Sequence, residues 1–188
     1  MDAPAFFSPY EEQPLAFAPH DRLAAEVGRH LALLLARFLP ETEVEHVGST
    51  AVPGLGGKNS INLLIAAPEE FFPDILNALE AMGMAEHPQK QEPADRPVRV
   101  GSIAGQERRY PVHVKVVAKG SPNHYNSVFM REYLRGNPEA ADAYAEVKRR
   151  LVESGGSEEE YGIAKQPHIL DIIARRPESW KKPGDPLA

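Results

Sequence analysis

The stretch VEHVGSTAVPGLGGKNSINLLIAAP, residues 44–68, decides the fold of this chain. It predicts a strand that ends in a tight turn at Gly48, a glycine-rich loop, and a second strand at residues 60–67. Alone, the triplet Gly48, Ser49 and Thr50 is more often a plain turn whose hydroxyls cap the next segment. Three further glycines and Lys58 follow, however, and N–H groups, hydroxyls and a cation gathered at one point favour phosphate binding. The order of residues is not that of the GxxxxGK[ST] phosphate loop.

The segments around this stretch predict alternating helices and strands. Apolar periodicity and proline or glycine breaks predict helices at 20–38, 69–83, 123–135, 138–153 and 157–175, and strands at 42–47, 98–105 and 108–120. Pro167 is expected to break or kink the last helix, whose start is predicted by Ser157 and the three glutamates after it. We therefore expect an N-terminal arm at 1–19, one α/β (α+β) domain with a mixed sheet at 20–175, and a tail at 176–188.

The composition of the chain limits the kinds of function that it can have. The chain has 188 residues, a length suited to one domain, and a net charge of −6, so no global basic field favours nucleic acid as a partner. It contains no cysteine, which excludes disulfides, thiolate metal sites and thiol nucleophiles. No signal peptide or membrane-spanning stretch is evident, so we expect a cytoplasmic protein with no membrane partner.

Several motifs together resemble one family. EHVGSTAVPGL, followed by Lys58 and an apolar strand, closely resembles the signature of the GrpB family, which belongs to the nucleotidyltransferase superfamily. The resemblance continues in PYEEQP (9–14), VHVKVVAKGS (112–121), MREYLRGNPEAADAYAEVKRRL (130–151) and YGIAKQPHILDII (161–173). It covers residues 9–173 and implies a nucleotidyltransferase (polymerase β palm-like) fold, a mixed sheet flanked by helices, with a C-terminal helical block.

The resemblance also places the positions of the catalytic metal. In the superfamily, the glycine-serine turn binds nucleotide phosphates, and two carboxylates on the next strand, with a third from a later one, bind Mg²⁺. Here those positions hold Asn62 and Leu64, and the third falls near His113 and Lys115. Because Mg²⁺ prefers anionic oxygen ligands, we expect a degenerate active site without a metal or an identifiable catalytic residue. Metal-dependent transfer is then impaired or lost, although Mg²⁺ is the cofactor that the superfamily implies.

The remaining candidates are basic side chains. The family pattern implies that Arg131, Lys148 and Lys165 face the glycine turn, and that His113 and Lys115 belong to the same cleft. For the helical residues the plainer interpretation is a solvated, ion-pairing face with tyrosines packed beneath it, and His113 is equally compatible with the core. We expect the ligand to be a nucleotide or another phosphorylated small molecule that hydrogen-bonds to Asn62.

Two other functions stay open. An active nucleotidyltransferase would need carboxylates from elsewhere in the chain, and Glu45, Glu92 and Glu107 are the candidates. A non-catalytic interaction module would use the fold as a scaffold and could form a homo-oligomer through the strand-rich edge at 98–117.

Overall fold

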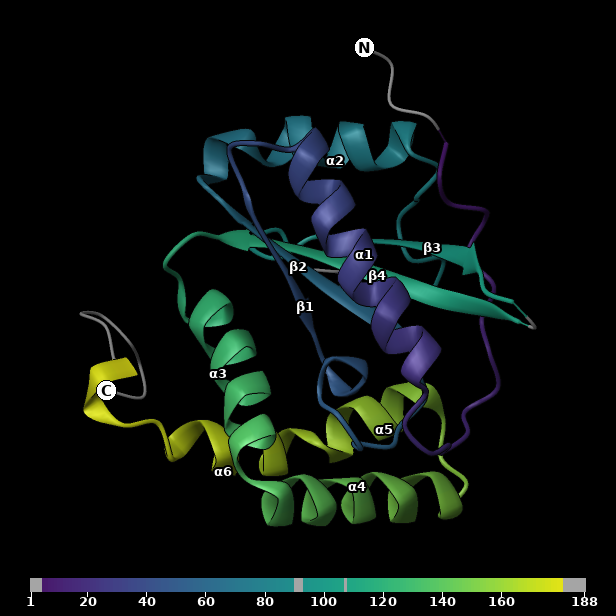
Figure 1. Cartoon of the computed structure of the whole chain (residues 1–188), viewed down its shortest axis with the longest axis vertical. Helices are drawn as coiled ribbons and strands as arrows, with labels where there is room; N and C mark the ends of the chain where they lie inside the picture. The colour runs from purple at the N-terminus through teal and green to yellow at the C-terminus, as the bar shows by residue number, and fades with distance from the viewer. Residues whose placement is uncertain (1–4, 90–92, 107, 181–188) are drawn as a thin grey trace.

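A computed structural model describes residues 5–89, 93–106 and 108–180 of the chain. Its centre is a four-stranded mixed sheet in the order β1-β2-β4-β3 (Figure 1). The central pair β2 and β4 is parallel, and the two outer pairings are antiparallel. The strands are β1 (Glu43–Val47), β2 (Ile61–Ala67), β3 (Val98–Ala104) and β4 (Arg109–Ala118).

Helices lie on both faces of the sheet. Helices α1 and α2 pack on one face, and α3 packs on the other, with α4, α5 and α6 gathered beside it (Figure 1). The helices are α1 (Arg22–Phe38), α2 (Phe72–Ala81), α3 (Pro122–Gly136), α4 (Pro138–Glu153), α5 (Glu158–Ala164) and α6 (Gln166–Ala174). Short 3-10 turns are η1 (Ser49–Ala51), η2 (Glu69–Phe71) and η3 (Glu178–Trp180).

The predicted α/β class with a mixed sheet and a helical C-terminal block is confirmed. The single helix expected at 157–175 is two helices, because α5 ends at Ala164 and Pro167 lies in the first turn of α6. Ser157 caps α5 in a capping box with Glu160, as the sequence predicts for a helix start. Among the described residues, no helix combines the length and the apolarity needed to cross a membrane.

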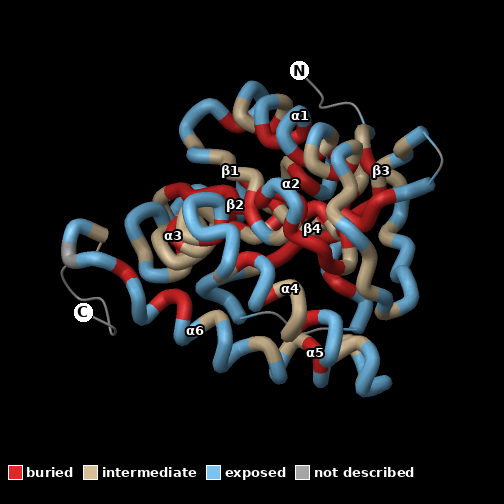
Figure 2. Tube along the Cα trace, turned by 60° about the horizontal axis from the view of Figure 1, so that its bottom comes forward, coloured by how far each residue is buried: buried red, intermediate tan, exposed pale blue. Residues whose placement is uncertain are grey.

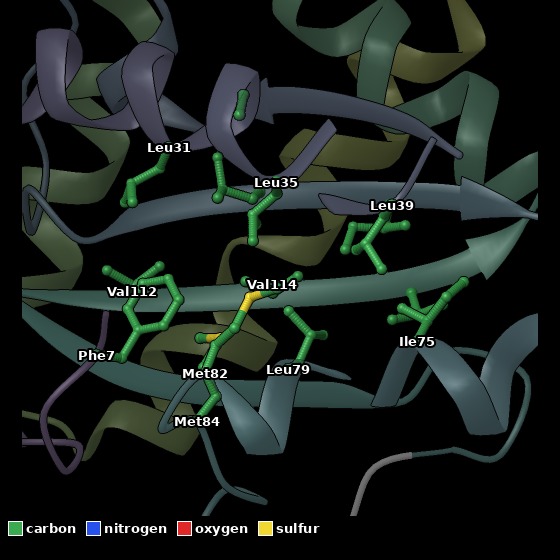
Figure 3. Packing of buried hydrophobic residues seen from close by; sticks show 14 of the residues in the cluster. Phe7, Leu31, Leu35, Leu39, Ile75, Leu79, Met82, Met84, Val112 and Val114 are labelled. Atoms are coloured by element: carbon green, nitrogen blue, oxygen red, sulfur yellow. The ribbon is translucent and has the colours of Figure 1, made fainter. Parts of the chain in front are cut away.

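The two central strands divide their side chains between a core and a polar face. Figure 2 shows the buried strands at the centre of the molecule, and Figure 3 shows Val112 and Val114 of β4 against Leu35 of α1 and Leu79 of α2. Because side chains alternate along a strand, the residues between them point to the opposite face. On β2 the core residues are Ile61, Leu63 and Ile65; on the two strands the opposite face carries Asn62, Leu64, His113 and Lys115.

The described part of the N-terminal arm packs against the domain. Phe7 is buried in the core, Ser8 bridges Ser102 on the outer edge of β3, and Ala18 bridges Gly57 in the glycine loop. Ala85 bridges the same outer edge of β3 at Val100. The strand-rich edge at 98–117, which the sequence suggests for a homo-oligomer, is therefore paired within the chain at two points of β3.

Candidate functional site

A cleft of about 530 Å³ opens between the glycine turn, the polar face of the sheet and helices α3, α4, α5 and α6. Nine of the ten predicted site residues line it: Gly48, Ser49, Lys58, Asn62, His113, Lys115, Arg131, Lys148 and Lys165. The apolar part of the lining consists of Val52, Leu55, Met130, Leu134, Ile169, Leu170 and Ile173. Segments far apart in the sequence thus form one concave surface that carries both cationic and apolar side chains.

The glycine turn needs its glycines for two separate reasons. Gly48 has φ 76° and ψ −171°, a conformation that side-chain-bearing residues rarely adopt, and a Cβ there would lie 3.1 Å from Nδ2 of Asn62. A Cβ on Gly57 would lie 2.8 Å from Oγ of Ser49 and 3.2 Å from Nζ of Lys148. The backbone therefore passes close to both polar groups, and Ser49 lines the cleft.

Thr50 does not line the cleft, although sequence places it with the phosphate ligands. Its side chain is 1% exposed, and its hydroxyl lies 2.9 Å from Nε2 of His46. Because Thr50 is the middle residue of η1, its side chain points away from that of Ser49. Burial, followed by the charges of Arg135 and Arg131, lowers the pKa of His46 to about 4. Through this contact with His46, Thr50 therefore stabilises the turn on the side away from the cleft.

Lys58 forms an ion pair that the sequence does not predict. Its Nζ lies 2.5 Å from Oε1 of Glu158, in the first turn of α5. Lys58 and Lys165 also lie over the ring of Tyr161, 5.8 Å and 5.0 Å from its centre. A carboxylate and an aromatic ring from α5 thus hold two lysines at the mouth of the cleft.

Lys148 is the most deeply buried cation of the site. The residue is 4% exposed, its Nζ donates to the backbone carbonyl of Gly56, and it lies 4.9 Å from the ring centre of Tyr144. Burial first, and then repulsion from Lys165, lower the pKa of Lys148 to about 7. This lysine is therefore close to half protonated at neutral pH.

Arg131 lines the cleft, but its guanidinium already binds acids of the chain. It donates to Oε2 of Glu45 at 2.6 Å, to the carbonyl of His46 at 2.8 Å and to Oε1 of Glu132 at 2.7 Å. Glu45 is a candidate replacement acid, yet it holds Arg131 and is absent from the cleft lining. The other two candidates, Glu92 and Glu107, lie outside the described residues.

The positions of the superfamily metal do not fit Mg²⁺. Asn62 pairs in register with His113, and Leu64 with Lys115, so an amide, an imidazole, an alkyl group and an ammonium meet there. Leu64 is 1% exposed and packs against Val117 and other apolar side chains. Within residues 5–89, 93–106 and 108–180, no group of three or more His, Cys, Asp or Glu could hold a metal ion.

Sequence reasoning missed part of the lining. The sequence marks Glu158 only as part of a helix start and Tyr161 only as one of the packed tyrosines, and it gives no signal for the polar residues Arg96, Asn123, Asn126, Ser127 and Gln166. Tyr161 had one usable signal, since it repeats the Tyr-x-x-x-Lys spacing of Tyr144 and Lys148. A larger hollow of about 700 Å³ lies between α4 and α6, and only Tyr144 among the residues considered above borders both spaces. It lacks the glycine turn, so we place the site in the smaller cleft.

Comparison with known proteins identifies the family. The family model described as GrpB protein matches residues 16–175. The chain belongs to the GrpB family. One relative is the UPF0157 protein SCO7215 of Streptomyces coelicolor, 32% identical over 149 residues that span 78% of this chain and 75% of that protein.

Solved structures agree on the fold. The conserved protein GrpB from Enterococcus faecalis matches with a TM-score of 0.68 and 24% identity, over 84% of this chain and 94% of that one. A chain of the GLD-2/RNP-8 complex matches with a TM-score of 0.51 and 17% identity, over 83% of this chain and 60% of that one. The fold of this GrpB-family chain is the nucleotidyltransferase fold. At these identities the likeness extends to the fold alone.

Proposed function

We propose that the cleft binds a nucleotide or another phosphorylated small molecule, and that cationic side chains rather than a metal ion balance the phosphate charge. The phosphate lies at the Gly48–Ser49 turn, where the Ser49 hydroxyl and backbone N–H groups donate to it. Lys148 and Lys165 face it from the helical block. The organic part of the ligand packs against the apolar wall of α3 and α6.

The charge of the cleft is the observation that carries this proposal. The chain has a net charge of −6, yet six basic side chains and one carboxylate of the described residues line the cleft. A concave, low-dielectric surface focuses such a charge and attracts anions. A metal site would need the opposite sign, because it concentrates carboxylates.

We further propose that this family member has impaired or lost metal-dependent transferase activity. The supporting observations are the neutral Asn62 and the buried Leu64 at the metal positions, and the ion pairs that engage Glu45 and Glu158. A carboxylate that already neutralises a guanidinium or an ammonium brings little net charge to a metal.

Calorimetric titration with ATP, GTP, CTP and UTP tests the binding proposal. We expect saturable binding of at least one nucleotide, and an affinity loss of about tenfold in Ser49→Ala and in Lys165→Ala, since each removes a charge-assisted phosphate contact. Arg175→Ala is the matched control, because Arg175 borders the larger hollow, where it pairs with Asp171. No binding of any nucleotide, together with stable self-association, would favour the interaction module instead.

A further inference from the structure

Lys148 is a buried lysine without a carboxylate partner among the described residues. Its Nζ donates to the neutral carbonyl of Gly56, while the nearby acid Glu158 is bound to Lys58. An isolated buried ammonium is costly, and such a lysine sheds its proton more readily than an exposed one. Another lysine of the cleft, Lys165, adds like-charge repulsion. The ligand-free site therefore disfavours the charged form of Lys148.

A bound phosphate reverses that balance. A Cβ on Gly57 would lie 2.8 Å from Oγ of Ser49 and 3.2 Å from Nζ of Lys148, so these two polar atoms are near each other. An anion held by the Ser49 hydroxyl therefore lies close to the lysine nitrogen. An opposite charge within a few ångströms favours the ammonium form. The group that is partly neutral in the free protein is thus fully protonated in the complex.

We propose that phosphate binding at the Gly48–Ser49 turn is coupled to the uptake of a proton by Lys148. The inference rests on the proposed function and adds to it that the ligand is taken up as an anion plus a proton. The proton comes from solvent, or from the ligand itself when its phosphate arrives singly protonated. It ends on Nζ of Lys148, and no covalent bond between heavy atoms changes.

The two tyrosines and the arginines of the cleft do not replace Lys148 in this role. Burial, and the charge of Glu158, raise the pKa of Tyr161 to about 12, and burial also raises the pKa of Tyr144, so both phenols stay protonated at neutral pH. Arginine keeps its charge at every accessible pH. The remaining groups that face the cleft are Lys58 with Glu158, Lys165, His113, Lys115, Arg96 and Arg131.

The sign of the pH dependence follows from these states. With a free-protein pKa of about 7, Lys148 is mostly protonated at pH 6 and mostly neutral at pH 8. Binding therefore takes up little proton at about pH 6, about half a proton at pH 7 and close to one at pH 8. Ligand affinity falls as the pH rises above 7, by up to about tenfold per pH unit.

Calorimetry in two buffers of different ionisation enthalpy measures this uptake. The titrant is ATP at about pH 8, where its terminal phosphate is fully ionised. We expect an uptake of nearly one proton in the wild-type protein and none in Lys148→Arg, which carries a permanent charge. Lys119→Arg is the control, since Lys119 is an exposed lysine paired with Glu43, and should leave the uptake unchanged.

A measurement without ligand keeps the proposal testable if the arginine variant folds poorly. In protein with ¹³C-labelled lysine, one side-chain Cε resonance should titrate near pH 7, and it should lose that transition when ATP is added. Binding with equal heats in both buffers, or uptake that persists in Lys148→Arg, would overturn the coupling while leaving the proposed function in place. Failure of every nucleotide to bind would remove the function and this inference with it.

Discussion

The two faces of the central sheet are built from the same strands and serve opposite purposes. On β2, Ile61, Leu63 and Ile65 are at most 1% exposed and pack against α1 and α2. The residues between them face α3 and the cleft, and Asn62 is the polar one. Asn62 thus differs in environment from its neighbours Ile61 and Leu63, because side chains alternate between the two faces of a strand.

The comparison adds a structural argument to the chemical one for the proposed loss of the metal site. Leu64 lies on the cleft side of the sheet but belongs to a small apolar cluster with Val47, Val117 and Val128 of α3. A carboxylate at this position would be buried among alkyl groups, at a large desolvation cost. Leu64 therefore belongs to the core, while Asn62 lines the cleft, as the proposed loss of the metal site requires.

The largest expected effect comes from the apolar face. Leu63→Ala should lower the free energy of unfolding by about 2–5 kcal/mol, because it removes a fully buried side chain and leaves a cavity. Asn62→Ala, one residue away, should cost less than about 1 kcal/mol, since it removes one hydrogen bond to the carbonyl of Ser60. Urea unfolding of the two variants makes the measurement. Equal losses of unfolding free energy in the two variants would contradict the division of β2 into a core face and a cleft face.

A second effect is the pH dependence of stability through His46. Its folded pKa of about 4 lies below the usual value of 6.5, so below pH 6.5 the unfolded chain binds a proton that the folded chain does not. The stabilisation is present above pH 6.5 and is lost as the pH falls toward 4. We expect a loss of about 2 kcal/mol, reduced for a partly exposed ring. Urea unfolding at about pH 7.5 and pH 4.5 should show a smaller drop in His46→Gln, which cannot titrate.

The glycine loop offers a sharper test of the cleft. Gly57→Ala places a methyl group 2.8 Å from the Ser49 hydroxyl, so the loop must shift and nucleotide affinity should fall about tenfold. Gly136→Ala is the matched control, because a Cβ there meets nothing within 4 Å. Calorimetry compares the two variants. Unchanged nucleotide affinity in Gly57→Ala would mean that the ligand does not contact the Ser49 hydroxyl.

The smallest expected effect concerns the ion pair at the cleft mouth. Glu158→Gln removes a carboxylate from the lining and leaves Lys58 to the ligand, so nucleotide affinity should rise about threefold. Stability should change by less than about 1 kcal/mol, as for a partly exposed pair. The same calorimetric titration measures the nucleotide affinity. Glu146→Gln, which breaks an exposed ion pair on α4, is the control. A fall in affinity would mean that Glu158 positions Lys58 for binding.

The sequence alone predicts those features of the site and fold that depend on residues close together in the chain. Ser49 and Lys58 lie within ten residues of Gly48, so the turn brings them near the ligand whatever the rest of the chain does. Nearly all helices and strands were also predictable, because proline and glycine mark their ends. The divided last helix was foreseen as a break at Pro167, although its two parts were not given separately.

The missed features depend on distant packing. The direction of the Thr50 side chain is set by η1 and by His46, and neither could be derived from the triplet. Glu158 pairs with Lys58 only because α5 folds back over the glycine loop, across 100 residues of sequence. The near-continuous apolar run of β2 hides which residues face the cleft, so the burial of Leu64 against α3 had no signal of its own.

The account depends most on cations taking the place of metal in this cleft, and ATP binding with and without Mg²⁺ tests it directly. We predict that the dissociation constants measured in EDTA and in excess Mg²⁺ agree within about threefold, with no nucleotide transfer in either condition. Binding that is more than about tenfold tighter with Mg²⁺, accompanied by transfer of a nucleoside monophosphate, would contradict it.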